Sequence, residues 1–320
     1  MIEHYRREIS VAAAILLVAA VLAVLAPQFF TLENQTDLLL NNMPVLIVAL
    51  GMTLIILTGH IDISVGSQFA ICGVAAGVIS KAGLPSPAVC IAVCLLGAVL
   101  GGMNGSLVAY FRLPSIVVTL AAMVALRDAL RWSTEGAWIQ DLPPGFQWFG
   151  LSQTGSQLVT FAAAGILVIC AHWSMRNLAA GRAVYATGSN PDAARLVGFD
   201  PRHIVFGVFT ATGALTGFAA FLNAARFNQI PSNAGIGLEL QVIAAVVVGG
   251  TAITGGRGTV PGTVLGVVLL GIIGPALTFL GVSAYWEKAI QGAIILAAVA
   301  IDSIRLRTGR NAGNIAAQSA

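Results

Sequence analysis

Long apolar segments recur along almost the whole chain, each bounded by charged residues or by clusters of Pro and Gly. A straight helix needs about 20 mostly apolar residues to cross the hydrocarbon core of a bilayer. Segments of about this length predict an all-α, polytopic membrane helical bundle of about ten transmembrane spans. The predicted spans cover residues 9–26, 43–59, 66–80, 88–111, 114–130, 157–175, 204–222, 239–254, 260–280 and 289–301.

Some of these spans are shorter than a straight crossing requires. Residues 66–80 and 289–301 are the clearest cases, so some spans are expected to be tilted, broken or only partly spanning. The first segment, 9–26, follows Arg6 and Arg7, which is also the order found in a secretory signal. Its length and its lack of a good small-x-small cleavage site favour an uncleaved first span.

Composition excludes a soluble enzyme. Hydrophobic residues make up 57% of the 320 residues and charged residues only 9%, whereas a typical soluble chain carries about 25% charged residues. The net charge of +3 is too small to indicate a nucleic-acid partner, and the expected surroundings are membrane lipid. The four cysteines lie in apolar stretches without a CxxC pair, and we interpret them as small core residues.

The basic residues predict an orientation, because cytoplasmic loops carry an excess of Lys and Arg. With the amino terminus inside, about 11 of the 16 Lys and Arg residues fall in the cytoplasm. Both termini are then cytoplasmic, with a C-terminal tail at 302–320. The cytoplasmic group is Arg6, Arg7, Arg112, Arg176, Arg182, Arg195, Arg202, Arg257, Arg305, Arg307 and Arg310.

The segment 176–203, after the sixth predicted span, is polar and basic, and it contains the signals of one short helix. Asn190 is a good N-cap, Pro191 suits the first helical position, and Asp192 favours the positive end of the helix dipole. Gly198 can adopt the left-handed conformation that ends a helix. The sequence therefore predicts a cytoplasmic helix of about seven residues.

So short a helix is not stable unaided and must be held by packing. Its apolar residues Ala193, Leu196 and Val197 lie three and four positions apart, on one face. A partner outside the bilayer is expected to receive this face. The alternative is a helix that only covers the cytoplasmic ends of its own spans.

Asp62 stands in an otherwise apolar stretch, 57–67, between the second and third spans. A carboxylate there is costly unless hydroxyls, a cation or backbone donors stabilise it. One interpretation is a structural Asp that caps the helix beginning near Ser64. The other is a gate or pathway group at a break between helices.

No motif indicates catalysis or a bound cofactor. The Gly-rich stretch 249–259 lacks the GxxxxGK[ST] pattern of a phosphate-binding loop, so its glycines predict a tight turn and close helix contacts instead. The histidines have no metal-ligand spacing, and no GxSxG or Ser/His/Asp set occurs. We therefore predict no enzyme, with no catalytic residue, cofactor or metal in this chain.

Glycines spaced four residues apart predict close helix packing, because hydrocarbon supplies no hydrophobic drive for helices to associate. Gly97, Gly101 and Gly105 form one such set, and Gly73 and Gly77 form another.

Together these stretches carry a resemblance to a known family. The matching pieces are LTGHIDISVGS at 57–67, GGMNGSLVAYFRLPSIVVTLAAM at 101–123, YATGSNPDAARLVGFD at 185–200 and GIGLELQVIAAVVVGGTAITGGRGTVPGT at 235–263. They resemble the permease subunit of bacterial ABC importers for monosaccharides, a group that includes ribose, xylose, galactose, rhamnose and furanosyl autoinducer systems. One departure is His60, where the family usually has Gly. The phrase IQDLPPGFQWFGL at 139–151 is most similar to the rhamnose and autoinducer branches.

The resemblance implies a single transmembrane permease domain over 1–320 in the bacterial inner membrane. It implies three kinds of partner: cytoplasmic ATP-binding subunits, a periplasmic sugar-binding protein and a second permease subunit, identical or paralogous. ATP and Mg²⁺ would be bound by the ATPase subunits and not by this chain. The implied ATPase-coupling helix consists of Asn190, Pro191, Asp192, Ala193, Ala194, Arg195, Leu196 and Gly198.

The predicted function is thus the permease of an ATP-driven importer, forming the path for a monosaccharide or a related small solute. The alternative is an ion-coupled secondary transporter, which would need buried ionisable groups such as Asp62, Asp128 or Glu239. The candidate gate or pathway residues are Thr58, His60, Asp62, Ser64, Ser67, Asn104, Thr119, Glu239 and Arg257.

Overall fold

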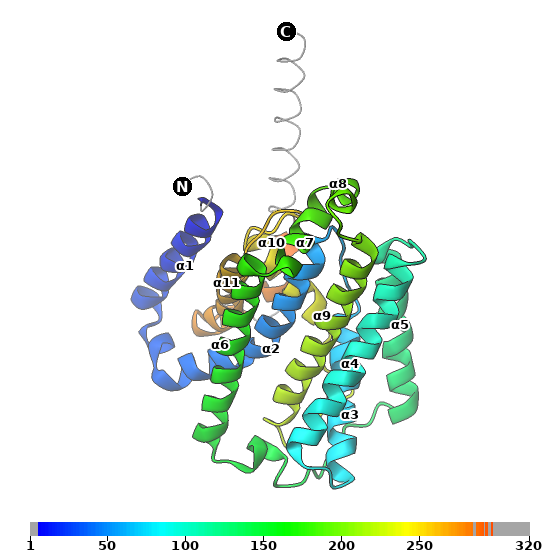
Figure 1. Ribbon diagram of the computed structural model, residues 1–320. Helices are drawn as coiled ribbons and strands as arrows, with labels where there is room; N and C mark the ends of the chain where they lie inside the picture. Colours follow the sequence, from blue (N-terminus) through cyan, green and yellow to red (C-terminus); the bar gives the residue numbers. More distant parts are fainter. Residues whose placement is uncertain (1–5, 284–285, 291, 294–295, 297–320) are drawn as a thin grey trace.

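The computed structural model describes residues 6–283, 286–290, 292–293 and 296, and this part of the chain is built from helices (Figure 1). An isolated bridge between Ile139 and Ile230 is its only β pairing, which confirms the predicted all-α class. The elements are α1 (Arg6–Leu25), η1 (Pro27–Phe30), α2 (Leu32–Leu57), α3 (Val65–Lys81), α4 (Ser86–Ala109), α5 (Ser115–Thr134), η2 (Gln147–Gly150), α6 (Gln153–Asn177), α7 (Ala179–Ser189), α8 (Pro191–Leu196), α9 (Pro201–Ala224), α10 (Leu238–Val248) and α11 (Val260–Phe279).

Nine of the ten predicted spans coincide with helices, but the count of ten membrane crossings is not confirmed. Among the described residues, six helices are long and apolar enough to span a bilayer: α1, α2, α4, α6, α9 and α11. α3 and α10 are apolar but shorter, which confirms that some spans are short. α5 carries Arg127, Asp128 and Arg131 near its end. The predicted span at 289–301 lies largely outside the described residues, as does the tail at 302–320.

Two boundaries differ from the hydropathy pattern for local reasons. α2 begins at Leu32, well before the predicted residue 43, because hydropathy marks only the apolar part of a helix, whereas Glu33 and Gln35 in its polar first turns have helix propensities close to that of Leu. The amides of Asn34 and Gln35 donate to Phe29 O across this start. α10 ends at Val248 because Gly249 and Gly250 follow, the latter with a φ of +100°.

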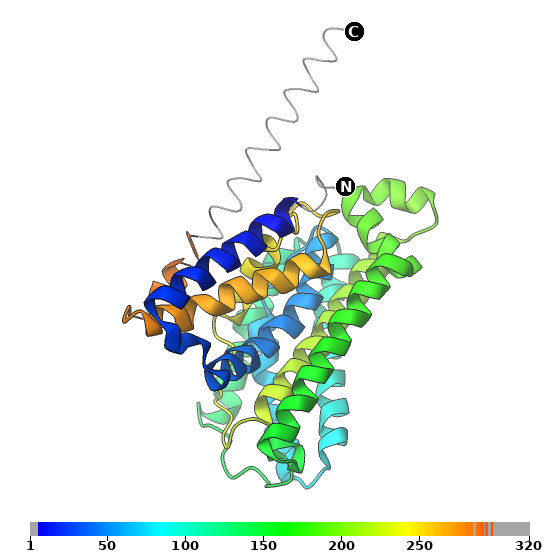
Figure 2. The ribbon, with the colours of Figure 1, turned by 90° about the vertical axis from the view of Figure 1, so that its left-hand side faces the viewer.

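Consecutive long helices run antiparallel between two ends of the bundle (Figure 1). One end carries α7 and α8, and we call it the α8 end. The ends of α2, α4 and α6 and the starts of α1, α5, α9 and α11 lie there, whereas α3 starts deeper in the bundle, where Ser64 accepts a hydrogen bond from Asn104 of α4. The loop at 135–152 and the turn after α9 lie at the opposite end. Figure 2 shows α1 and α11 side by side, and Thr259 Oγ1, before α11, donates to Glu8 Oε1 of α1.

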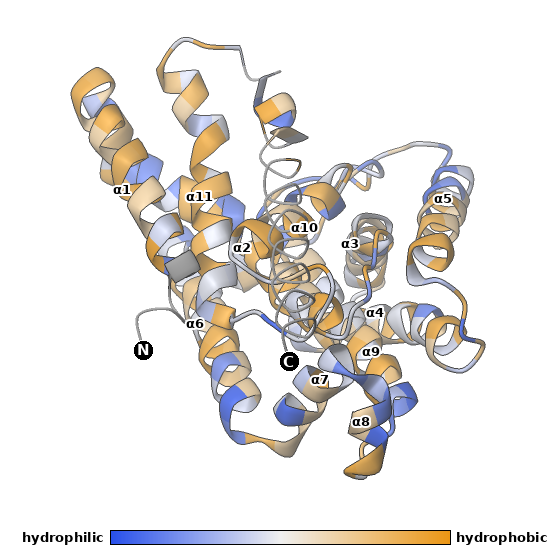
Figure 3. Ribbon diagram, turned by 90° about the horizontal axis from the view of Figure 1, so that it is seen from above, coloured by the Kyte–Doolittle hydropathy of each residue, from blue (hydrophilic) through white to orange (hydrophobic). Residues whose placement is uncertain are grey.

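The middle of the bundle is formed by α2 and α10, with α3 beside them (Figure 3). In the most apolar 18-residue window of α2, 78% of the residues are buried, against 11% in α1 and 17% in α6. Leu16 and Leu17 of α1 and Ile166 and Ile169 of α6 are largely exposed. An apolar surface of this kind on the outer helices suits contact with lipid.

α10 crosses only part of the bundle. Its 11 residues rise roughly 16 Å, about half the thickness of a hydrocarbon core. The chain before it is not helical, and it runs along α3 from Ile230, which faces Gly73 and Gly77, to Gly235, which faces Gly66. Gly73 and Gly77, predicted to pack helices, therefore accommodate this irregular segment. Such backbone is tolerated at membrane depth only where protein surrounds it.

The most extensive helix contact in the described part joins α4 to α9 and is made through glycines. A methyl group at Gly213 would overlap Gly97 O, and one at Gly217 would overlap Val93 O. Gly101 and Gly105 face Phe209 and its neighbours in the same way. The predicted packing role of Gly97, Gly101 and Gly105 is confirmed.

Replacing Gly213 by Ala is expected to separate α4 from α9 and to destabilise the protein by about 1–3 kcal/mol through overpacking. The control is Gly207→Ala on the same helix, where no atom lies within 4 Å of the new methyl group. The measurement is the thermal unfolding midpoint of the detergent-solubilised protein. Equal midpoints for the two variants would contradict the close approach.

Candidate functional site

The short helix predicted after the sixth span is present as α8, with the predicted signals at its ends. Asn190 Oδ1 accepts hydrogen bonds from Asp192 N at 3.0 Å and Ala193 N at 3.1 Å, so it is the N-cap. Pro191 occupies the first position, and Gly198, with a φ of +89°, turns the chain after the helix. The helix is six residues long.

The side of α8 that faces the protein is not the predicted apolar face. Ala194 is the buried residue of this helix, with 1% of its surface exposed. Leu196 and Val197 are 89% and 69% exposed. Ala193 is also exposed, so the three predicted apolar residues are all open to a partner.

The chain returns from α8 into α9 through a second capped start. Asp200 Oδ1 accepts from Arg202 N at 3.0 Å, and Pro201 is the first helical residue. His203 Nδ1 lies 2.9 Å from Asp200 Oδ2. These bonds, first of all the one from Arg202 N, lower the pKa of the Asp200 carboxyl. The cap therefore stays ionised and fixes the direction in which α9 leaves α8.

α7 connects α8 to the ends of the membrane helices through backbone contacts. A methyl group at Gly188 would overlap Leu57 O, at the end of α2, and would crowd Gly256 N. Gly256 N itself donates to Leu57 O at 2.9 Å, and Tyr185 Oη donates to Gly258 O at 2.8 Å. The three stretches that stood out in the sequence, 57–67, 176–203 and 249–259, thus meet at the α8 end.

The Gly-rich stretch forms the tight turn that was predicted for it. Gly250, Gly255, Gly256 and Gly258 all have positive φ values. Arg257 is exposed, and its carbonyl accepts from Ala252 N at 2.8 Å. The turn brings the start of α11 against the end of α2.

Asp62 is buried with 1% exposure and is surrounded by donors. Its Oδ1 accepts from Ser64 N at 2.9 Å and Ser64 Oγ at 2.6 Å, and its Oδ2 lies 3.3 Å from Gln68 Nε2. Asn104 Nδ2 of α4 donates to Ser64 Oγ at 2.8 Å. We call Asp62, Ser64, Gln68 and Asn104 the Asp62 network. It fixes the break before α3 and joins it to α4.

Three more of the candidate pathway residues use their hydroxyls on nearby carbonyls. Thr58 donates to Ile55 O, Ser67 to Met123 O and Thr119 to Ser115 O, at 2.7, 2.8 and 2.9 Å. These bonds secure the ends of α2, α3 and α5 around the Asp62 network. Gln68 was not among the predicted residues, although it stands four positions after Ser64, the spacing that places two side chains on one helix face.

His60 and Glu239 both lie near the Asp62 network, His60 two residues before Asp62 and Glu239 against Gly66 of α3. His60 is half-buried, its ring centroid is 6.3 Å from that of Phe209, and it borders a hollow of about 480 Å³ that Arg112 also lines. Glu239 stands at the start of α10 and faces Gly66, and its Oε2 is buried without a hydrogen bond among the described residues. No group of three His, Cys, Asp or Glu side chains suited to a metal occurs in the described part of the chain.

Residues 34–299 match the family described as branched-chain amino acid transport system / permease component. The chain belongs to this family. The permease is 35% identical over 307 residues to the autoinducer 2 import system permease protein LsrC of Photorhabdus luminescens, covering 94% of this chain and 91% of that one. It is also 35% identical over 297 residues to the ribose import permease protein RbsC of Escherichia coli K12, covering 91% and 92%. No solved structure matches it.

Substituting Gly188 by Ala is expected to push α7 away from Leu57 and to break the hydrogen bond from Gly256 N. The amide of Gly256 should then exchange with solvent about tenfold faster or more, since local opening becomes easier. Hydrogen exchange followed by mass spectrometry measures this, with Gly207→Ala as the control. Unchanged exchange at residues 249–259 would contradict the close contact of Gly188 with Leu57 and Gly256.

Asp62→Leu is expected to destabilise the protein by about 1–3 kcal/mol for each buried donor left without an acceptor, first of all Ser64 N. Asp62→Asn keeps an oxygen that accepts from Ser64 N, so its effect should be clearly smaller. Thermal unfolding midpoints of the two variants give the comparison. Equal midpoints for Asp62→Leu and Asp62→Asn would mean that the hydrogen bonds of the Asp62 network do not stabilise the non-helical stretch before α3.

Proposed function

We propose that this permease forms the path of an ATP-driven importer for a monosaccharide or a related sugar-like solute, and that α8 couples it to separate ATP-binding subunits. The import permeases for ribose and autoinducer 2, similar over more than nine-tenths of this chain, support the solute class. The observation that carries the coupling is α8 itself. It is capped at both ends, stands outside the bundle, and exposes Leu196 and Val197.

The path from α8 into the bundle supports a mechanical role. α8 joins α7 directly, and α7 touches Leu57 of α2 and the turn before α11 by backbone atoms. A partner that moved α8 on binding ATP would displace these two helix ends together. Such a displacement drives transport if the permease alternates between conformations that differ in their affinity for the solute.

The arrangement of charges supports a cytoplasmic location for the α8 end. The exposed arginines of the connections that meet there include Arg112, Arg182, Arg195 and Arg257. Loops that carry an excess of Arg remain on the cytoplasmic side. The proposed assembly therefore has both termini and the ATPase inside the cell, and a periplasmic sugar-binding protein and a second permease subunit complete it.

The double variant Leu196→Asp/Val197→Asp tests the coupling. Both side chains are exposed, so the variant should fold, yet it should no longer retain the ATP-binding subunits that copurify with the wild type. An aspartate side chain buried against an apolar surface without a partner costs about 2 kcal/mol or more, roughly a 30-fold loss of affinity. Leu151→Asp, also exposed but at the opposite end, is the control.

Transport is measured in proteoliposomes loaded with ATP, using radiolabelled ribose, other pentoses and hexoses, and leucine. The proposal expects uptake of a sugar that requires ATP and that the double variant loses. Uptake that survives in the double variant, or a wild-type chain without an ATP-binding partner, would overturn the coupling. Uptake that stops when the proton gradient is collapsed at constant ATP would favour the ion-coupled alternative.

A further inference from the structure

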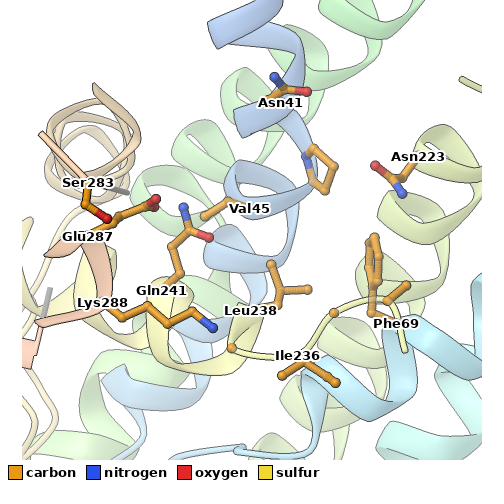
Figure 4. Close-up of a pocket in the computed structure, with 14 residues that line it drawn as sticks. Asn41, Val45, Phe69, Asn223, Ile236, Leu238, Gln241, Ser283, Glu287 and Lys288 are labelled. Atoms are coloured by element: carbon orange, nitrogen blue, oxygen red, sulfur yellow. The ribbon is translucent and has the colours of Figure 1, made fainter. Parts of the chain in front are cut away.

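A cavity of about 670 Å³ lies away from α8 and is lined by five separate parts of the chain (Figure 4). Asn41 and Val45 come from α2, Asn223 from the end of α9, and Gln241 from α10. Residues that follow α11 close another side. Its volume is in the usual range for small-molecule sites, about 300–1,000 Å³.

The position of the cavity relates it to transport. α9 starts beside α8, and Asn223 is near its other end, so a rise of 1.5 Å per residue puts Asn223 roughly 30 Å from α8. That distance is about the thickness of the hydrocarbon core. On the proposed orientation, the cavity is reached from the periplasmic side.

The inner wall of the cavity is the irregular segment before α10. Gly235, Ile236 and Gly237 belong to both the segment and the cavity lining. On its other side Gly235 packs against Gly66, which is two residues beyond Ser64 of the Asp62 network. A solute in the cavity would thus be separated from that network by one layer of backbone.

The lining is suited to hydroxyl groups. Side-chain amides both donate and accept hydrogen bonds, as each sugar hydroxyl does. The amides of Asn223 and Gln241 form no hydrogen bond within the described part of the chain, whereas Asn41 Oδ1 lies 3.3 Å from Arg226 Nη1. The polar side chains of the lining are Asn41, Asn223, Gln241, Ser283, Glu287 and Lys288.

Apolar groups complete the site. Phe69 contributes an aromatic side chain to the lining, and the face of such a ring carries partial negative charge that suits the C–H side of a sugar ring. Gly237, with a φ of +84°, turns the chain beside Lys288 at the edge of the cavity. Polar groups that converge beside apolar ones are typical of small-molecule sites.

From this geometry we infer that the cavity is a weak binding site for a polyhydroxylated solute, a monosaccharide ring or a similar polyol, on its way through the permease. The inference rests on the proposed function and deepens it by assigning residues: Asn223 and Gln241 bind hydroxyls, and Phe69 packs on the ring. Binding is weak, because a solute held tightly would not move on.

Cysteine protection tests binding without any ATPase. Ile236 lines the cavity and is 53% exposed, so Ile236→Cys introduces a thiol without removing an amide. The full-length chain in nanodiscs, with Cys72, Cys90, Cys94 and Cys170 replaced by Ala, is labelled with a small methanethiosulfonate reagent. A transported sugar at about twice its dissociation constant should slow labelling about threefold by mass action.

The matched control is Ala137→Cys, an exposed position outside the cavity lining, where sugar should leave labelling unchanged. Ribose, xylose and glucose are the probes, with NaCl of equal osmolality as the blank. Equal labelling rates with and without every sugar would overturn the cavity assignment. That result is independent of the proposed function, which fails only if the wild-type complex shows no ATP-dependent sugar uptake.

A second variant assigns the amides. Asn223→Leu/Gln241→Leu should reduce the protection of the thiol introduced by Ile236→Cys and slow ATP-driven sugar uptake about tenfold, while leaving the ATP-binding subunits bound. Asn223→Gln/Gln241→Asn keeps both amides and should restore part of the protection. Gln153→Leu, at an exposed position on α6, controls for the loss of an amide alone. Full protection in the double leucine variant would mean that these amides do not bind the solute.

Discussion

Every backbone N–H and C=O that is not in a regular helix must find a partner inside the protein, because the bilayer interior offers none. This constraint explains where the chain departs from helix. The break before α3 is held by Asp62 and Ser64, the turn before α11 by the bond from Gly256 N to Leu57 O, and the segment before α10 by its passage along α3. Each of these stretches is held by contacts within the protein, and each adjoins a region for which a function is proposed.

The α8 end and the cavity are the two regions for which a function is proposed. They are connected through these irregular stretches. The α8 end holds the exposed helix that is proposed to couple to the ATPase, and α7, which joins it to α2 and to the turn before α11. The cavity near the opposite end is closed on its inner side by the segment that leads into α10. α10 packs on both α2 and α11, so it stands between the junction and the cavity. A displacement of α7 could therefore reach the wall of the cavity through α2 and α10.

Features that depend on neighbouring residues could be predicted from the sequence, and features that depend on distant ones could not. Asn190, Pro191 and Gly198 act within one short helix, so its limits were predicted correctly. Which residue of that helix packs on the rest of the protein depends on distant elements such as α9, and no local signal marked Ala194, which is buried there. The glycines of α4 were recognised by their spacing, which is a local signal. The cavity was missed because Asn41 and Asn223 become neighbours only when α2 and α9 pack.

The contact between Gly188, Leu57 and Gly256 consists of main-chain atoms alone. Side chains can absorb a small shift by changing rotamer, but a peptide group has no such freedom. A contact made by main-chain atoms is therefore rigid. A displacement of α7 would move the end of α2 and the turn before α11 with it. Gly188 and Gly256 also cannot be replaced by a larger residue without a shift of the backbone, since a Cβ atom at either position would overlap its neighbours.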